Sequence, residues 1–243
     1  MCIRVLIFLE EIMSKIKKLI CYFSRFELCL FGGSVVLIVA AFIAFDRENY
    51  LYLAASLVGA ASLIFCAKGN PIGQLLMIVF STLYGIISYT FSYYGEMITY
   101  LAMTLPMAVV ALISWLKNPY KNNRAEVKVN RIKGQEVAFM LALSVLVTMV
   151  FYFVLKAFNT ANLIPSTISV TTSFIAVYLT FRRSAYYALA YAANDVVLIV
   201  LWELASYEDV SYISVLVCFV MFLANDLYGF VSWKKREKTQ KLL

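Results

Sequence analysis

Two Asn-Asp pairs interrupt long apolar stretches of this sequence. Asn194 and Asp195 lie in "YAANDVVLIVLWELASYED", and Asn225 and Asp226 lie in "FLANDLYGFVSWKK". A carboxylate at the centre of a bilayer costs about 2.5 to 3.5 kcal/mol on insertion scales, so it usually faces a bundle interior, a polar partner or water. The pairs therefore serve either as hydrogen bonds between neighbouring helices or as the lining of a path for a polar solute.

Aromatic side chains accompany the pairs at helical spacing. A Trp follows each Asp seven residues later, and two helical turns place Trp202 on the face of Asp195 and Trp233 on the face of Asp226. Trp233 lies near the end of its stretch, where an interfacial anchor is expected. Rings combined with carboxylates and amides suit a flat ring that carries hydroxyl groups. Further side chains that can line such a path are Gln74, Ser81, Thr82, Tyr84, Ser88, Tyr89, Tyr186, Tyr187, Tyr191 and Tyr228.

Other chemistries find little support in the sequence. The chain has no His, which is the usual general base and the commonest metal ligand, and its five Cys show no CxxC spacing. We therefore expect no metal site, no cofactor and no disulfide framework. Aspartates alone, without a nucleophile or a base, give thin support for a membrane-embedded enzyme.

Composition requires an integral membrane protein. Apolar residues make up 63% of the 243 positions and charged residues 14%, whereas soluble domains are about half apolar and a quarter charged. About 20 apolar residues cross a bilayer as a helix, so the pattern predicts an all-α bundle of about eight transmembrane helices. Pro106 is expected to kink one span, and Gly73, Gly85 and Gly229 are expected to permit close helix contact. The expected spans are residues 27–45, 50–66, 71–93, 96–116, 136–158, 166–181, 185–205 and 209–232.

The basic residues predict the orientation. Lys and Arg collect on the cytoplasmic side of membrane proteins. With eight spans and both termini in the cytoplasm, all but two of the 21 Lys and Arg, namely Arg47 and Lys156, fall on that side. We therefore predict a multi-pass protein of a bacterial-type cytoplasmic membrane. The net charge of +7 then reflects topology and attraction to the lipid bilayer, and no nucleic-acid partner is expected.

Residues 1–25 differ from a cleaved signal peptide. Acidic residues follow the apolar start and the lysines come later, whereas a signal peptide has basic residues first, an uninterrupted apolar core and a small-residue cleavage site. Apolar residues set against charged ones predict an amphipathic helix that lies in the membrane interface.

The chain contains two similar three-span units. "YYGE" and "SYED" join the second and third spans of each unit, the units end in "WLKN" and "WKKR", and their first spans end in "FCAKGN" and "TFRRS". Three helices reverse the chain's side of the membrane, so one linking span makes the two units parallel, which is a known transporter plan. The predicted divisions are an interfacial helix (1–25), an extra N-terminal span (26–48), the first repeat (49–118), a basic cytoplasmic loop and linker helix (119–160), the second repeat (161–234) and a basic cytoplasmic tail (235–243).

The chain from about residue 50 onward resembles the PnuC family of transporters of nicotinamide riboside and related vitamins. The resemblance is strongest between Ser173 and Trp233, in "SFIAVYLTFRRS", "AYAAND" and "LANDLYGFVSWKK". These stretches are similar to the family's segment before a basic pair, its aromatic-rich helix ending in Asn or Asp, and its closing Asn, Gly and Trp pattern. The resemblance implies a core of two three-helix units joined by one linking helix, like that of the sugar-transporting SWEET proteins.

The resemblance also implies a binding site. In the family, a WxxW motif clamps the nicotinamide ring, and the matching positions here are Ala188 and Tyr191, so one wall of the clamp is missing. A neighbouring position that often holds Gln is Val177. Tyr191 and Trp202 are expected to stack on the ring. The expected substrate-binding residues are Ser173, Tyr187, Ala188, Tyr191, Asn194, Asp195, Trp202 and Asn225. The residues expected in a gate or polar pathway are Gln74, Tyr84, Asp226 and Tyr228.

The implied activity is facilitated import of an unphosphorylated nucleoside-like vitamin, with nicotinamide riboside as the first candidate. The resemblance further implies a homotrimer and a cytosolic kinase that traps the imported product by phosphorylation. Because one clamp wall is absent, thiamine, riboflavin and deoxynucleosides stay open as substrates, and so does proton coupling through a buried carboxylate. A more remote alternative is a non-transporting membrane scaffold or sensor, in which the Asn-Asp pairs only join helices.

Overall fold

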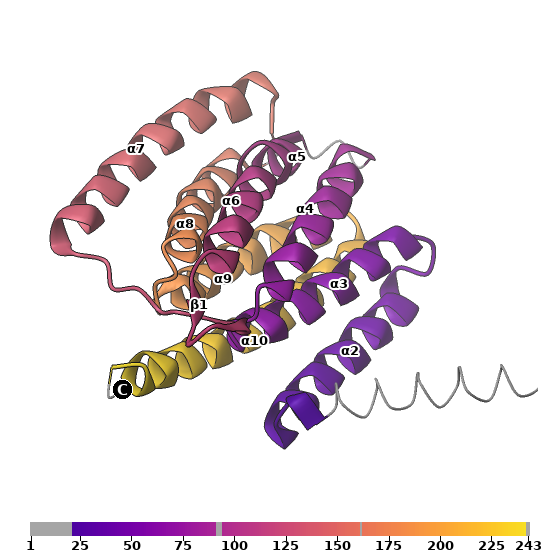
Figure 1. Ribbon diagram of the computed structural model, residues 1–243. Helices are drawn as coiled ribbons and strands as arrows, with labels where there is room; N and C mark the ends of the chain where they lie inside the picture. Colours follow the sequence, from indigo (N-terminus) through magenta and orange to yellow (C-terminus); the bar gives the residue numbers. More distant parts are fainter. Residues whose placement is uncertain (1–20, 91–93, 161, 242–243) are drawn as a thin grey trace, which may run out of the picture.

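The computed structural model describes residues 21–90, 94–160 and 162–241, which fold almost entirely into helices (Figure 1). Eight helical segments of these residues are long and apolar enough to cross a membrane, which confirms the all-α membrane class. The interfacial helix expected over residues 1–25 lies almost wholly outside the described residues. The helices are α2 (Arg25–Phe45), α3 (Tyr50–Ala67), α4 (Ile72–Thr90), α5 (Tyr94–Ile98), the π-helix η1 (Thr99–Thr104), α6 (Leu105–Leu116), α7 (Gly134–Ala157), α8 (Leu163–Phe181), α9 (Tyr187–Ser206), the 3-10 helix η2 (Val210–Tyr212) and α10 (Ile213–Thr239).

The end of the last helix differs from the prediction. Helix α10 continues to Thr239, beyond the expected end of its span at residue 232 and through much of the expected tail. Glu237 is buried in the last turns of α10 and pairs with Lys234, at 2.8 Å, and with Arg131 of the loop between α6 and α7. These ion pairs hold the basic C-terminal turns of α10 against the rest of the protein.

The fourth span is interrupted by the π-helical segment η1, which directly precedes α6 and Pro106. Proline has no backbone N–H and its ring clashes with the preceding turn of an α-helix. A widened turn before it relieves that clash, and such π-segments are frequent at functional sites. The predicted irregularity is therefore present, and it takes the form of a π-segment.

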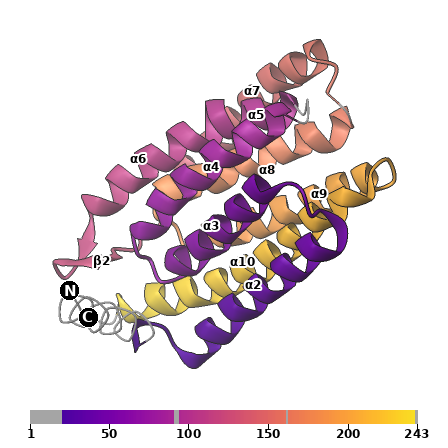
Figure 2. The same cartoon turned by 90° about the vertical axis from the view of Figure 1, so that its right-hand side faces the viewer.

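The spans form two triplets, α3-α4-α5/α6 and α8-α9-α10 (Figures 1 and 2). Consecutive spans pack together within each triplet. The third span of each triplet also packs on the first span of the other, because α10 contacts α3 and α6 contacts α8. This reciprocal packing encloses an interior between the two triplets.

Corresponding hydrogen bonds join the triplets. At the end of α6, the hydroxyl of Ser114 and the indole N–H of Trp115 donate to the last two carbonyl oxygens of α8, each at 2.9 Å. In α10, Ser232 and Trp233 donate in the same way to the last two carbonyl oxygens of α3, each at 2.8 Å. The short "SW" sequence shared by the two repeats therefore performs the same structural task in both.

The turns after α3 and α8 also correspond. Gly69 and Arg183 both adopt left-handed backbone conformations, with φ of 67° and 55°. The backbone N–H of Val127 donates to the carbonyl oxygen of Gly69 and that of Asn130 donates to the carbonyl oxygen of Arg183, each at 2.9 Å. One stretch of the connecting loop therefore ties together equivalent turns of the two triplets.

The connecting loop contains a small hairpin that the sequence did not predict. Strands β1 (Pro119–Tyr120) and β2 (Asn123–Val127) pair antiparallel. The hairpin lies beside the C-terminal end of α10, where many of the Lys and Arg collect (Figure 2). We call this end of the bundle the basic end, and the opposite end, with residues 46–49 and 206–212, the far end.

Two further helices accompany the triplets. Glu27 of α2 pairs with Lys68 at the end of α3, at 3.1 Å, and Glu136 of α7 pairs with Arg182 at the end of α8. Each triplet thus carries a helix attached at the corresponding place, which makes two tandem units of four spans. The packing differs, since α2 contacts both α3 and α10 whereas α7 packs mainly on α8 and lies at the edge of the bundle (Figure 1).

Glycines permit the close helix contacts that the sequence predicted. A Cβ atom on Gly85 would lie 2.5 Å from Leu101, and one on Gly73 would lie 2.5 Å from the Sγ atom and 2.6 Å from the backbone nitrogen of Cys66. The contact at Gly229 is looser, with Ala188 at 3.4 Å. Backbone atoms cannot move aside as a flexible side chain can, so Gly73 is the most restricted of the three.

We expect Gly73→Ala to lower the melting temperature of the detergent-purified protein, because the added methyl group forces α3 and α4 apart. Overpacking of this kind costs about 1 to 3 kcal/mol. The matched control is Gly33→Ala in α2, since, apart from the adjoining backbone of its own helix, no atom of the described residues lies within 4 Å of the Cβ position at Gly33. Equal melting temperatures for the two variants would contradict the predicted clash.

Candidate functional site

A polar cavity lies between the two triplets. In this conformation it encloses about 30 Å³, room for roughly one or two water molecules. Both triplets contribute to its wall, through α3, α4 and η1 on one side and α8, α9 and α10 on the other. The lining residues are Leu63, Met77, Phe80, Tyr100, Thr104, Ser173, Tyr191, Asn194, Asp195, Leu198, Phe219, Phe222 and Asp226.

Two buried carboxyl groups face this cavity. Asp195 and Asp226 are each only 4% exposed, and they lie close enough to interact directly. The Oδ2 atom of Asp195 has no hydrogen-bond partner among the described residues. Among the described residues that line the cavity there is no Lys or Arg. A buried acceptor without a partner costs about 1 to 3 kcal/mol, and more if charged, so the cavity is built to receive a hydrogen-bond donor or a cation.

The side chain of Asn194 is held by α8. Its Oδ1 atom accepts hydrogen bonds from Thr172 at 2.7 Å, Ser173 at 3.0 Å and Ser169 at 3.3 Å. Hydroxyl residues at this spacing lie on one face of α8, which explains why a single amide meets all three. The Asn194 side chain is therefore fixed in orientation, and its NH2 group is the part that remains for a ligand.

Aromatic rings close the cavity toward the far end. Tyr84 and Tyr100 lie with ring centroids 4.4 Å apart, Phe80 and Phe222 5.6 Å apart, and Tyr84 and Phe219 6.1 Å apart. We call these five rings the far-end aromatic cluster. They come from α4, η1 and α10, so the barrier is made by both triplets together.

A second group of rings closes the cavity toward the basic end. The ring centroids of Tyr187 and Trp233 are 4.8 Å apart, those of Trp115 and Trp233 5.3 Å, and those of Tyr187 and Tyr191 6.2 Å. We call these four residues the basic-end aromatic cluster. With rings on both sides, the cavity is occluded in this conformation.

Five of the residues predicted to contact substrate or form a gate line the cavity. They come from three helices that the sequence alone did not place next to one another. These residues are Ser173, Tyr191, Asn194, Asp195 and Asp226.

The structure places other predicted residues elsewhere. Trp202 does not reach the cavity, because it lies seven residues beyond Asp195, about 10 Å along the helix axis, and it lines a separate pocket at the far end together with Tyr84. Asn225 points away toward α2, where its Nδ2 atom donates to Ser34 at 2.9 Å. The sequence suggested that Trp202 and Tyr191 stack on one ring, but the structure separates them.

The remaining predicted residues have packing or bonding roles. Gln74 donates to the sulfur of Cys66, Tyr187 belongs to the basic-end aromatic cluster, and Ala188 packs against Gly229. Tyr228 donates to Glu27 at 2.9 Å. None of these four side chains is part of the cavity wall.

Several cavity residues were not singled out from the sequence. The largest are the aromatic Phe80, Tyr100, Phe219 and Phe222, which form most of the wall on the far side. Aromatic residues are common in all the spans of this chain, so type and spacing did not distinguish these four. Only the kink expected at Pro106 drew attention to the part of the chain near Tyr100.

Comparison with known proteins agrees with this architecture. The model of the nicotinamide mononucleotide transporter family matches residues 49–235. The nicotinamide riboside transporter PnuC of Neisseria mucosa is 28% identical over 222 residues, which cover 89% of this chain and 82% of that protein. A crystal structure of the vitamin B3 transporter PnuC is similar with a TM-score of 0.79 at 25% identity, covering 90% of this chain and 94% of the other. These relatives are transporters rather than enzymes or scaffolds, and they confirm the family resemblance seen in the sequence. The chain, with its occluded polar cavity between two helix triplets, therefore belongs to the nicotinamide mononucleotide transporter family and is a PnuC-type membrane transporter.

Proposed function

We propose that the protein carries nicotinamide riboside across the membrane by facilitated diffusion. The observation that carries this proposal is the pair Asp195 and Asp226 in a cavity with several aromatic walls, with one carboxylate oxygen of Asp195 unpartnered among the described residues. Nicotinamide riboside combines a positively charged pyridinium ring with a neutral ribose. Aromatic faces attract such a cation, and carboxylates accept hydrogen bonds from ribose hydroxyls.

The charge of the cavity favours the riboside over its phosphorylated form. Nicotinamide mononucleotide adds a phosphate, which needs Lys, Arg or clustered N–H donors. The part of the wall that the structure describes has two carboxyl groups and no basic side chain, so a phosphate placed here would meet like charge without compensation. The unphosphorylated riboside avoids this cost.

Transport requires the two triplets to move relative to each other. The cavity of about 30 Å³ is several times smaller than a ribonucleoside, so substrate enters only after one aromatic cluster has parted. We propose that the triplets rock as units, so that the far-end aromatic cluster opens while the basic-end aromatic cluster stays closed, and then the reverse. No ion need accompany the substrate in this scheme.

The basic end is proposed to face the cytoplasm of a bacterial-type cell. Lys and Arg collect there, as expected for cytoplasmic loops, and both chain termini then lie in the cytoplasm. A cytosolic kinase that phosphorylates the imported riboside would keep the free concentration low and so maintain net uptake. The phosphorylated product would not return, because it fits the acidic cavity poorly.

A homotrimer is proposed as the assembly, as the family resemblance implies. Helix α7 exposes apolar side chains along its length, among them Phe139, Val145, Met149 and Phe153. Such a surface suits lipid or a second copy of the chain. The mass of the particle purified in a mild detergent, measured by light scattering, distinguishes a trimer from a monomer.

Nicotinamide riboside is expected to raise the melting temperature of the detergent-purified protein, whereas nicotinamide mononucleotide is expected to leave it almost unchanged. A ligand that binds only the folded state stabilises it by about 2.7 kcal/mol at 100 times its Kd. Thiamine, riboflavin, cytidine and thymidine complete the panel. A larger shift with any of these four would assign a different substrate.

Uptake of labelled nicotinamide riboside into proteoliposomes tests the transport mode. The initial rate is expected to be the same with and without an imposed pH gradient, provided that the internal and external pH values stay within the range where the protein is stable. Acceleration only under a gradient would replace the uncoupled scheme by proton coupling.

A further inference from the structure

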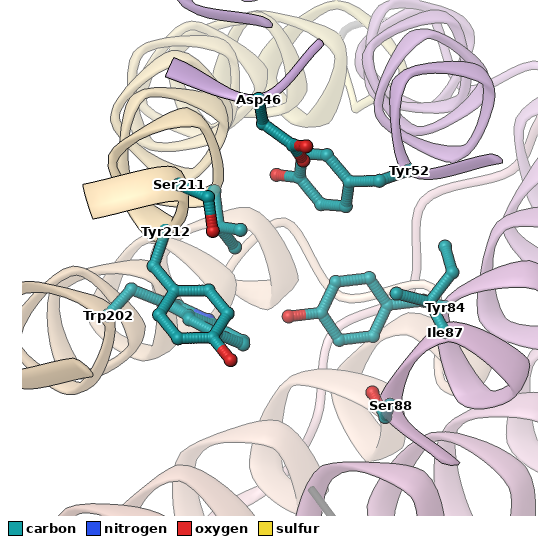
Figure 3. A pocket seen from close by; sticks show the side chains of 9 residues that line it. Asp46, Tyr52, Tyr84, Ile87, Ser88, Trp202, Ser211 and Tyr212 are labelled. Carbon is teal, nitrogen blue, oxygen red and sulfur yellow. The ribbon is translucent and has the colours of Figure 1, made fainter. Parts of the chain in front are cut away.

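A second pocket lies on the far-end side of the cavity. It is bounded by α3 and α4 from one triplet and by α9, η2 and α10 from the other, so it continues the interface between the triplets (Figure 3). Tyr84 belongs both to this pocket and to the far-end aromatic cluster. The far-end aromatic cluster therefore lies between the cavity and this pocket, which we call the outer vestibule. The lining of the outer vestibule includes Asp46, Tyr84, Trp202 and Tyr212.

The hydroxyl group of Tyr84 points into the outer vestibule. Tyr84 is only 3% exposed, and its hydroxyl has no hydrogen-bond partner among the described residues. In Figure 3 this hydroxyl points across the open space toward the rings of Trp202 and Tyr212. A buried hydroxyl left without a partner is costly, and its direction shows where a ligand atom would satisfy it.

Asp46 supplies a negative charge to the same space. This residue follows α2 and is 7% exposed. Its Oδ1 atom accepts a hydrogen bond from the side chain of Asn49 at 2.6 Å. The hydrogen bonds described for the Asp46 carboxylate all end on Oδ1, and within the described part of the chain no Lys or Arg forms a salt bridge with it. The Oδ2 side of the carboxylate is therefore the one that remains for a cation.

Aromatic rings form the remaining wall. The centroids of Trp202 and Tyr212 are 5.4 Å apart, with 50° between their planes, and Tyr84 lies opposite them (Figure 3). Rings of Trp and Tyr attract organic cations through their negative faces, and Trp does so best. A carboxylate beside such rings selects a flat aromatic cation over a neutral molecule of the same shape.

We propose that the outer vestibule is a separate first binding site for an aromatic cation of the pyridinium class, occupied before the ligand enters the cavity. Asp46 provides the counter-charge, Trp202 and Tyr212 hold the ring, and Tyr84 bonds the ligand before turning aside to open the far-end aromatic cluster. The vestibule has room for about one water molecule in this conformation, so the rings part as the cation enters. The role in uptake rests on the proposed function, whereas binding of the cation does not.

The test measures binding directly, with the 1-methylnicotinamide cation as the probe and Trp fluorescence of the full-length, detergent-purified protein as the signal. This small pyridinium is expected to quench the fluorescence saturably, and Trp202→Phe is expected to remove the saturable part. Asp46→Asn is expected to raise the Kd of the probe about fivefold to tenfold. This is the affinity typically lost when a partly desolvated contact of a cation with an anion or an aromatic ring is removed. Neutral nicotinamide is expected to bind much more weakly.

A further variant separates this site from its surroundings. Glu208→Gln removes an exposed charge at the same end of the bundle, and it is not expected to alter the Kd of the probe. Saturable quenching that survives Trp202→Phe, or that Asp46→Asn leaves unchanged, would overturn the vestibule site. Because Asp46→Asn is nearly isosteric, the test stands even if Trp202→Phe fails to fold.

The binding and transport results can be read separately. Saturable quenching without uptake of nicotinamide riboside would reject the proposed function and keep the vestibule site. Uptake of nicotinamide riboside without saturable quenching would reject the vestibule site and keep the proposed function.

Discussion

Asp195→Asn is expected to reduce uptake of nicotinamide riboside into proteoliposomes by about tenfold to 100-fold. The change preserves the shape of the side chain but removes a charge that the described residues leave partly unpartnered. A hydrogen bond to a charged group contributes about 1.5 to 3 kcal/mol, and 1.4 kcal/mol corresponds to a tenfold change. The protein should still insert and fold, because the substitution relieves the repulsion of two buried acidic groups.

Glu203→Gln is the matched control for this experiment. Glu203 lies on the same helix, two turns beyond Asp195, but on an exposed face. The same change of carboxylate to amide should leave uptake within a factor of about two of the wild-type rate, because single surface charges have small effects. If Asp195→Asn also transported at the wild-type rate, the two aspartates would serve only as a contact between helices α9 and α10. The proposed substrate site would then be wrong.

Trp233→Ala is expected to cause a large loss of stability. The side chain is fully buried, packs against Trp115 and Tyr187, and donates to the carbonyl oxygen of Cys66. Removing a buried Trp typically costs about 3 to 5 kcal/mol. The loss should appear as a lower melting temperature in detergent and as faster aggregation on heating.

The internal repeat provides the comparison for this prediction. Trp115 occupies the corresponding position, with its indole donating to Thr180, so Trp115→Ala should cost a similar amount. Trp233→Phe keeps much of the ring volume and loses the hydrogen bond, which contributes about 1 kcal/mol, so its loss should be clearly smaller. A Trp233→Ala protein as stable as the Phe variant would show that the basic-end aromatic cluster does not hold the triplets together.

The two Asn-Asp pairs illustrate how a repeated motif can divide its tasks. Asp195 and Asp226 both face the cavity, and Asn194 presents its amide there after being fixed by α8. Asn225, by contrast, joins α10 to α2. The sequence left helix contact and solute path as alternatives for the pairs, and the structure assigns three members to the cavity wall and one to a contact between helices.

Much of the fold followed from the sequence, because membrane insertion leaves few choices. Uninterrupted apolar length sets the number of spans, and the spacing of charges marks their ends, so the helices lie close to the expected ranges. The similar segments "WLKN" and "WKKR" pointed to two three-span units, and the Trp of each segment makes the corresponding hydrogen bond in the structure. Asp195 and Asp226 stood out because few groups are so costly in a membrane.

The composition of the site depended on tertiary structure. Helical spacing predicts which residues share a face, but it gives neither the depth at which that face meets a ligand nor the helix that lies opposite. Trp202 shares a face with Asp195 yet belongs to the outer vestibule, and Phe222 and Tyr100 line one cavity only because the packing of the two triplets brings α10 and η1 to its wall. The hydrophobic pattern fixes which segments enter the membrane, whereas the packing of one triplet against the other decides which of their side chains surround the same space.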